Sequence, residues 1–340
     1  MLKYAQLRQY MSLIFINIFL LIHNHCIHNG GAKILDLINT IQKIKEKDWK
    51  VLKIIEVLMR HYEWVPLDEI IKKTKIGDRE VYYRLKILDR FKLINRSSYG
   101  YRLSHKGYDG LALNAFIRRE VIKAIGGELG VGKEGDVYNV LLSNNREAVL
   151  KFHKLGRTCF TRGKRYRSYL ADKRHISWLY ASRLTAEREF QVLNDLFPIV
   201  KVPEPIEQNR HCIIMGKLEG IELKRVDLTS LNIDIDKLFW DIIEEIKKMY
   251  EIGYIHGDLS EFNILINEKG DFLIIDFPQA LQIKNNSKTI KIDKLPLELE
   301  IDKEFYLKRD LENILRYFRK YDIKEDLNNI YQYVIEDKEE

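Results

Sequence analysis

Residues 255–265 read Ile-His-Gly-Asp-Leu-Ser-Glu-Phe-Asn-Ile-Leu, and a second acidic segment, Ile-Ile-Asp-Phe, follows at 274–277. The carboxylate of Asp258 could accept a proton from an attacking hydroxyl or orient a water molecule. The side-chain oxygens of Asn263 and Asp276 are hard ligands, suited to a magnesium ion that bridges nucleotide phosphates. These residue types therefore predict a phosphoryl-transfer centre.

The spacing D-L-x-x-x-N followed by D-F is the pattern of the catalytic and metal-binding loops of protein kinases. Apolar runs at 264–266 and 272–275 predict the short strands that such loops require on either side. We therefore interpret Asp258 and Asp276 as catalytic and place the metal at Asn263 and Asp276. Two loop aspartates that only cap turns are the simpler alternative.

Upstream, residues 130–138 read Gly-Val-Gly-Lys-Glu-Gly-Asp-Val-Tyr and fit G-x-G-x-x-G-x-V. Strands are expected after the glycines, at 137–142 and 148–151, which favours a hairpin whose turn covers the phosphates over a dinucleotide-binding fold. Lys151 in the second strand would neutralise phosphate charge and is also assigned as catalytic. The residues expected to cover the nucleotide are Gly130, Val131, Gly132, Lys133, Glu134, Gly135, Asp136 and Val137.

A helix expected at about 176–196 offers two acidic partners for Lys151, Glu187 and Glu189. Glu189 is preferred because it shares a helical face with apolar residues three, four and seven positions later, namely Val192, Leu193 and Leu196.

A buried strand is expected at 211–215, and a hinge between two lobes at 216–219. There an adenine would bind backbone groups, at Met215 and Lys217.

Residues 33–119 have helical periodicity and then two short strands around 96–98. One expected helix carries an inward face of Trp49, Leu52, Ile55, Leu58 and Met59; a later one, capped by Asp78, carries Val81, Leu85 and Leu88. This is the outline of a winged helix. Nucleic-acid contacts are expected from Arg79, Tyr83, Arg84 and Lys86 on the outer face. Packing against a protein is the competing interpretation of that face.

A dense basic run at 156–175, with interleaved aromatic residues, predicts a loop ordered by RNA phosphates or by nucleotide. Its candidate nucleic-acid contacts are Arg162, Lys164, Arg165 and Arg167.

The 340 residues indicate two domains, and 57 Lys and Arg against 50 Asp and Glu give a net charge of +7, compatible with a polyanionic partner. The three cysteines form no C-x-x-C pair, which argues against disulfides or a zinc cage and indicates a cytoplasmic protein. The apolar run at 11–22 is shorter than the roughly 20 residues that span a bilayer, so no membrane contact is expected.

The expected boundaries are an extension at 1–32, a winged-helix domain at 33–119, a kinase-like domain at 120–325 and a tail at 326–340. The kinase-like part divides into lobes at about 120–215 and 220–325. A charged linker at 284–304 and a helix at 305–320 follow Asp276, without the A-P-E element of conventional protein kinases. The predicted fold is α+β: a winged helix followed by a truncated two-lobed protein-kinase-like domain.

Together these motifs resemble the Rio family of atypical protein kinases, second subfamily, over about 35–325. The resemblance rests on the winged-helix outline, the glycine segment 130–138, Leu-Lys-Phe-His-Lys-Leu-Gly-Arg-Thr (150–158), Ser-Trp-Leu-Tyr-Ala-Ser-Arg (177–183), His-Gly-Asp-Leu-Ser-Glu-Phe-Asn (256–263), Ile-Asp-Phe-Pro-Gln (275–279) and Lys-Arg-Asp-Leu (308–311). The chain departs from the family in three places: Gly135 replaces a usual serine, the linker after Gln279 is longer, and the first thirty or so residues lack a counterpart.

The resemblance implies an ATP- and magnesium-dependent serine/threonine protein kinase or ATPase, with manganese as a substitute metal. It implies a role in small ribosomal subunit maturation, with the subunit precursor, its RNA and a protein substrate as partners. Mapped onto this chain, Asp258 is the base, Asn263 and Asp276 hold the metal, and Lys151 pairs with Glu189. Asp276 is also implied as a transient phosphate carrier.

Two alternatives stay open. The catalytic segment also resembles that of aminoglycoside and choline phosphotransferases, although a winged helix and a basic loop would not help to bind a small substrate. The second alternative is a non-catalytic assembly factor that binds nucleic acid and is gated by nucleotide. The complete set of Lys151, Asp258, Asn263 and Asp276 argues against it.

Overall fold

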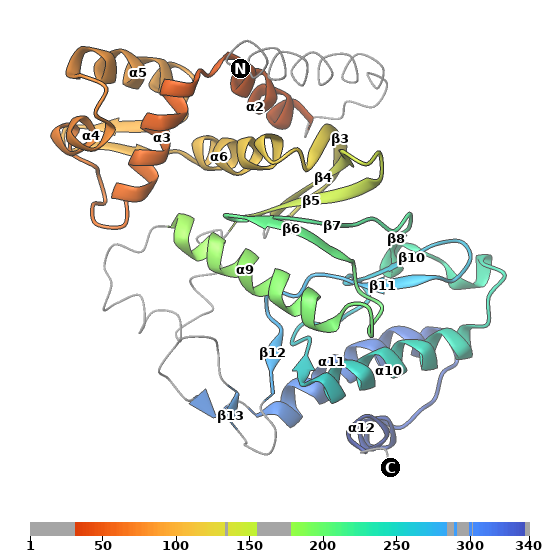
Figure 1. Cartoon of the computed structure of the whole chain (residues 1–340). Coiled ribbons are helices and arrows are strands. Elements are labelled where there is room, and N and C mark those ends of the chain that lie inside the picture. The colour runs from red at the N-terminus through yellow and green to blue at the C-terminus, as the bar shows by residue number, and fades with distance from the viewer. Residues whose placement is uncertain are drawn as a thin grey trace. The chain divides into compact units, whose positions relative to one another are not determined.

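The computed structural model describes residues 31–132, 135–154, 178–283, 289–290, 299–300 and 302–336 (Figure 1). The chain folds as two compact units, Met1–Glu187 with Glu207–Ile214, and Arg188–Ile206 with Met215–Glu340. Within the described residues, every helix is too short or too polar to cross a membrane.

The first unit begins with the helices and the hairpin that the sequence predicted as a winged helix. The elements are α2 (Gly31–Lys43), α3 (Glu46–Leu58), α4 (Leu67–Thr74), α5 (Asp78–Arg90), β1 (Ile94–Ser97), β2 (Gly100–Leu103) and α6 (His105–Arg118). All the predicted inward-facing residues of α3 and α5 are buried in one apolar cluster, which confirms the helical periodicity.

One local prediction in this domain was wrong. Asp78 is the first residue of α5, and the cap position belongs to Gly77, which has no side chain to bond the helix terminus. The helix α6 begins at His105, where Ser104 Oγ accepts a hydrogen bond from Gly107 N at 3.0 Å. A strand then starts at Ile122.

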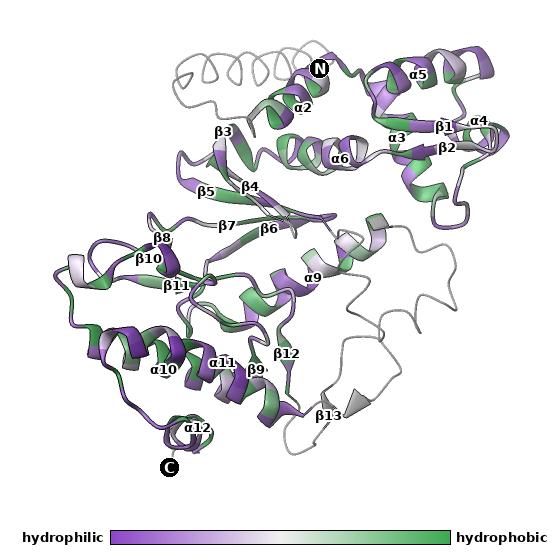
Figure 2. Ribbon diagram, turned by 180° about the vertical axis from the view of Figure 1, so that it is seen from behind, coloured by the Kyte–Doolittle hydropathy of each residue, from purple (hydrophilic) through white to green (hydrophobic). Residues whose placement is uncertain are grey.

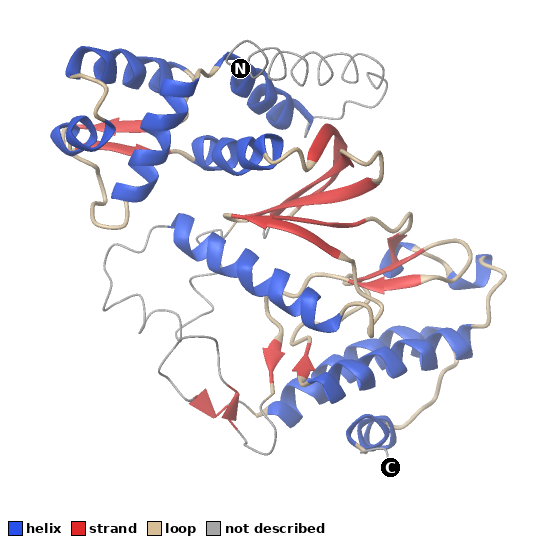
Figure 3. Cartoon of the chain, viewed as in Figure 1, coloured by secondary structure: helices blue, strands red, loops and turns tan. Residues whose placement is uncertain are grey.

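A five-stranded sheet follows, in the order β3-β4-β5-β7-β6; its strands are labelled in Figure 1 and drawn red in Figure 3. Its strands are β3 (Ile122–Val131), β4 (Gly135–Leu142), β5 (Glu147–His153), β6 (Pro205–Asn209) and β7 (Cys212–Gly216). β4 pairs antiparallel with both β3 and β5. The glycine segment therefore lies in a hairpin between β3 and β4, as predicted.

The remaining elements carry the catalytic segment. They are α9 (Trp178–Leu196), β8 (Ile221–Glu222), η1 (Leu223–Arg225), η2 (Leu228–Ser230), α10 (Ile235–Ile252), β9 (Tyr254–Ile255), β10 (Ile264–Ile266), β11 (Phe272–Ile274), β12 (Leu281–Gln282), β13 (Thr289–Ile290), β14 (Leu299–Glu300), α11 (Lys303–Phe318), η3 (Arg319–Tyr321) and α12 (Leu327–Ile335). Green and purple residues alternate around α10 and α11 in Figure 2, as expected of helices with one buried face.

The predicted C-terminal tail is largely a helix. Asp326 caps α12 by accepting hydrogen bonds from the backbone of Asn328 and Asn329, and α12 packs on α10 and α11. Ile330 and Val334 are buried, and Lys247 Nζ of α10 donates to the Tyr333 carbonyl at 2.8 Å. The helix is short, and only these two of its positions are fully buried, so its periodicity gives little signal in the sequence.

Candidate active site

The segment between β9 and β10 is fixed first by His256, which is fully buried. Its Nε2 donates to the Ile275 carbonyl at 3.0 Å, and its ring lies 4.8 Å from that of Phe277. Burial lowers the pKa of His256, so the imidazole is neutral near pH 7. His256 therefore joins the two acidic segments structurally, from a position shielded from solvent.

Asp258, Asn263 and Asp276 meet at one end of the β10–β11 hairpin. The Asn263 side chain donates from Nδ2 to the Asp258 carbonyl at 2.8 Å, and Ile275 N donates to the Asn263 carbonyl at 2.9 Å. The Asp258 side chain is exposed, so its carboxylate can be reached by a substrate. The structure thus brings together the three residues that the sequence predicted.

Asp276 has a φ of 73°, in the left-handed region that residues other than glycine rarely adopt. Such strain is held by the surrounding structure and gathers at functional sites. Here the neighbours on each side are fixed, since Ile274 pairs with Ile264 and Phe277 is buried.

The catalytic loop is anchored by a residue that sequence reasoning missed, Asp310 of α11. Its Oδ2 accepts from Gly257 N at 2.7 Å, and its Oδ1 accepts from Leu259 N at 3.1 Å. Asn313 Nδ2 donates to the Leu259 carbonyl at 2.9 Å, and the Arg309 guanidinium donates to the Gly257 carbonyl. Asp258 lies between the two anchored peptides, so α11 determines its position.

Burial raises the pKa of Asp310 to about 7, against the opposing effects of its two backbone donors and of Arg309. A signal for this residue was present in the sequence. Asp310 lies on the buried face of α11 with Leu307, Leu311 and Ile314, and a buried carboxylate requires hydrogen-bond partners.

Lys151 and Glu189 are both buried, at 8% and 1% exposure, on β5 and α9 respectively. Glu187 instead accepts from Arg183 Nε of the same helix at 2.7 Å and stays partly exposed. The inward orientation predicted for Glu189 is therefore confirmed. Its pairing with Lys151 stays a prediction.

In the glycine hairpin, Gly132 N donates to the Gly135 carbonyl at 2.9 Å. A Cβ on Gly135 would lie 2.4 Å from the Phe152 carbonyl oxygen, so any side chain at this position would require β4 and β5 to shift apart. Gly130 and Val137 pair across the hairpin. Lys133 and Glu134, and the side chain of Val131, lie outside the described residues.

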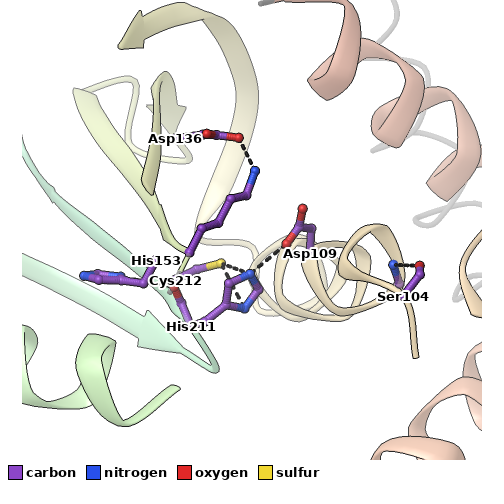
Figure 4. Close-up of polar contacts among 8 residues, drawn as sticks. Ser104, Asp109, Asp136, His153, His211 and Cys212 are labelled. Atoms are coloured by element: carbon purple, nitrogen blue, oxygen red, sulfur yellow. Dashed lines mark hydrogen bonds and ion pairs between the residues drawn. The ribbon is translucent and has the colours of Figure 1, made fainter. Parts of the chain in front are cut away.

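Asp136, expected near the phosphates, is buried and forms an ion pair with Lys154, and its contact with nucleotide stays a prediction (Figure 4). Its carboxylate is thus bonded to a lysine that directly follows β5.

At the predicted hinge, Met215 is buried, Gly216 N donates to the Glu204 carbonyl at 2.8 Å, and Lys217 pairs with Glu219 at 3.5 Å. Residues 217–220 have no regular structure, consistent with recognition through the backbone.

On the winged helix, Arg79, Tyr83 and Lys86 are exposed as predicted. Arg84 is not, because its guanidinium bonds Glu80 at 2.6 Å and lies 3.4 Å from Asp48, with 12% of the side chain exposed. The prediction for Arg84 overlooked these acidic neighbours. Arg162, Lys164, Arg165 and Arg167 lie outside the described residues.

A divalent metal is implied by the sequence pattern, and the donor set fits one. Because Nδ2 of Asn263 is bonded to the Asp258 carbonyl, its Oδ1 is the atom available as a ligand. The Asp276 carboxylate is a second hard oxygen ligand, and magnesium usually takes one or two protein oxygens and completes its shell with phosphates and water. The described residues contain no cluster of three or more His, Cys, Asp or Glu side chains that could hold a metal alone.

Comparison with known proteins identifies two families along the chain. Residues 136–330 match the RIO domain, and residues 41–119 match the N-terminal domain of Rio2. The chain is 62% identical over 283 residues to the RIO-type serine/threonine-protein kinase Rio2 of Methanocaldococcus jannaschii, covering 81% of this chain and 99% of that protein. It is 36% identical to the serine/threonine-protein kinase rio2 of Schizosaccharomyces pombe, covering 86% and 81% of the two chains.

A solved structure agrees with this assignment. The crystal structure of the Rio2 kinase–ADP/Mg²⁺–phosphoaspartate complex from Chaetomium thermophilum aligns with a TM-score of 0.69 at 31% identity, over 88% of this chain and 89% of that one. The small-molecule phosphotransferase interpretation is thereby set aside. The winged-helix domain, the RIO domain and the assembled catalytic loop establish that this chain belongs to the Rio2 group of RIO-type serine/threonine protein kinases.

Proposed function

We propose that this protein transfers the terminal phosphoryl group of ATP, with Mg²⁺ or Mn²⁺, to a serine or threonine hydroxyl or to water during maturation of the small ribosomal subunit. The observation that supports it most is that hydrogen bonds join Asn263 both to Asp258 and to Ile275, the residue before Asp276, at one loop end. The ADP and Mg²⁺ in the Chaetomium Rio2 complex agree with this choice of substrate and metal.

In the proposed reaction, an oxygen of the hydroxyl or water attacks the terminal phosphorus while the bond from phosphorus to the ADP oxygen breaks. The Asp258 carboxylate accepts the proton of the attacking group. When bound, the metal neutralises charge on the phosphates, and Asn263 and Asp276 would hold it. Lys151, paired with Glu189, would neutralise phosphate charge from the sheet.

We further propose Asp276 as a transient acceptor of the phosphoryl group. A phosphoaspartate is present in the Chaetomium Rio2 complex. In this chain the strained backbone of Asp276 is held on both sides, as is common for residues at functional sites. An acid-labile, hydroxylamine-sensitive label from γ-³²P-ATP that Asp276→Asn abolishes is the expected result, and a label that survives this substitution would contradict it.

The proposed partner is the precursor of the small ribosomal subunit and its RNA, contacted through the winged helix and the basic run at 156–175. The exposed Arg79, Tyr83 and Lys86 support a nucleic-acid surface on α5. ATP turnover should rise when small-subunit precursor particles or their RNA are added with Mg²⁺. Equal stimulation by large-subunit RNA would argue against the ribosomal specificity, whereas turnover that EDTA does not abolish would argue against the metal.

A further inference from the structure

The turn that follows Asp276 is packed against the catalytic loop. Ala280 N donates to the Phe277 carbonyl at 3.1 Å, which closes the turn, and Phe277 and Ala280 are both buried. Directly afterwards, Leu281 of β12 pairs with Ile255 of β9, the strand that leads into the catalytic loop. Both ends of the turn are thus fixed to the structure that carries Asp258.

The backbone of Gln279 lies close to the loop. A Cβ on Gly257 would be 2.7 Å from the Gln279 carbonyl oxygen, and Gly257 has a φ of 80°. Glycine at 257 therefore allows a close approach that any other residue would prevent. Arg188 of α9 donates to the next carbonyl, that of Ala280, which also holds the turn.

This close packing places the Gln279 side chain on the catalytic carboxylate, with Nε2 donating to Asp258 Oδ2 at 3.2 Å. Asn263 uses its amide differently, because it donates to the main-chain oxygen of Asp258. Gln279 and Asn263 therefore hold the carboxylate and the peptide of Asp258 respectively.

We propose that Gln279 is a positioning residue for Asp258, which goes beyond the residues assigned above and rests on the proposed phosphoryl transfer. Its amide occupies Oδ2 and leaves Oδ1 to accept the proton of the attacking hydroxyl or water. The amide neither gains nor loses a proton during the reaction. A carboxylate fixed in one orientation reacts more often from a productive geometry.

The expected effect is moderate. Removing one hydrogen bond from a neutral amide to the carboxylate should lower kcat about 3- to 10-fold, well short of the roughly 10²–10⁴-fold loss on removing a general base. The KM for ATP should stay within about two-fold of wild type, because Gln279 is not among the nucleotide-binding residues. The side chain is exposed, so Gln279→Leu leaves no buried void and should melt at the wild-type temperature.

The experiment compares Gln279→Leu, Asp258→Ala and the double variant, with Gln332→Leu as a matched exposed glutamine on α12. If Gln279 acts through Asp258, the substitution Gln279→Leu should lower kcat when Asp258 is present and cause no further loss in the Asp258→Ala background. Equal loss in both backgrounds would overturn the proposal, as would an unchanged kcat. Absence of turnover in the wild type would instead refute the proposed function.

A second variant decides the matter if residual turnover in Asp258→Ala is too low to measure. Gln279→Glu places two carboxylates at the same position, where they share a proton. The acidic limb of the pH–kcat profile should then move to higher pH, while Gln332→Glu leaves it in place. An unmoved limb in Gln279→Glu would show that residue 279 does not act on Asp258.

Discussion

Arg210 forms a two-bond ion pair with Glu56, with Nε–Oε1 and Nη2–Oε2 distances both of 2.7 Å. Glu56 lies on α3 of the winged helix, and Arg210 lies in the turn between β6 and β7. The adjacent His211 donates to Asp109 of α6 at 2.7 Å (Figure 4). Its ring also stacks on that of Tyr108, with centroids 4.4 Å apart. This hairpin turn therefore joins the sheet to the winged-helix domain through several largely buried interactions.

Replacing Arg210 with alanine should lower the free energy of unfolding by about 2–3 kcal/mol, because a mostly buried Glu56 loses its partner. The matched control is Arg119→Ala, whose ion pair with Glu207 is largely exposed and should contribute below about 1 kcal/mol. Guanidinium unfolding curves followed by circular dichroism provide the measurement. Equal losses of unfolding free energy in the two variants would show that the Arg210–Glu56 pair contributes no more to stability than an exposed ion pair.

Asp310→Ala should lower ATP turnover about 10- to 100-fold although residue 310 contacts no substrate. The N–H groups of Gly257 and Leu259 would lose their acceptor, and Asp258 between them would no longer be fixed. Steady-state kinetics with a control substitution of the partly exposed Glu312 on the same helix test this. Wild-type turnover in Asp310→Ala would mean that α11 does not position the loop.

The pH dependence of stability offers a separate test of Asp310. Its pKa is raised from an ordinary value near 4 to about 7, so the folded state retains the proton over a range in which the unfolded chain has released it. The contribution of this group is therefore full at low pH and is lost as the pH rises through about 7. The slope is at most about 1.4 kcal/mol per pH unit.

This slope should be absent from Asp310→Asn, which cannot titrate. Subtracting its unfolding free energies from those of the wild type between pH 5 and 8 isolates the effect of the carboxyl group. A difference that is flat across this range, or that rises with pH, would contradict the raised pKa.

On the winged helix, the double substitution of Arg79 and Lys86 by alanine should weaken RNA binding and leave stability unchanged. Both side chains are exposed, and each lost phosphate contact should reduce the slope of log K against log salt by about 0.7–0.9. Arg84→Ala should instead lower the stability of the protein, because Arg84 bonds Glu80 and Asp48. Lys324→Ala, an exposed lysine outside α5, is the control.

Much of the site could be predicted from sequence, because its chemistry depends on residues close together in the chain. Asp258, Asn263 and Asp276 are separated by a single hairpin, so their spacing alone indicated that they would meet. Glu189 could be chosen over Glu187 because a helix separates such neighbours onto opposite faces.

Asp310 was missed because it acts across a long sequence separation. For Asp136 and Arg84, the sequence did not reveal the ion pairs that they form within the fold. Asp310 reaches Gly257 from more than 50 positions away, and periodicity gives the face of a helix but not its partner. Asp136 and Arg84 have the types expected of ligand contacts, yet nearby opposite charges bind them within the fold. Such pairings depend on tertiary structure, which residue type cannot reveal.

The most direct test of the catalytic centre is release of γ-phosphate from ATP with Mg²⁺ by the wild type and by Asp258→Ala, with ATP binding measured by calorimetry on the same samples. Turnover should fall about 10²–10⁴-fold in the variant while ATP affinity stays within a few-fold, since Asp258 acts on the attacking group and not on the nucleotide. Undiminished turnover in Asp258→Ala would contradict the assignment of Asp258 as the base.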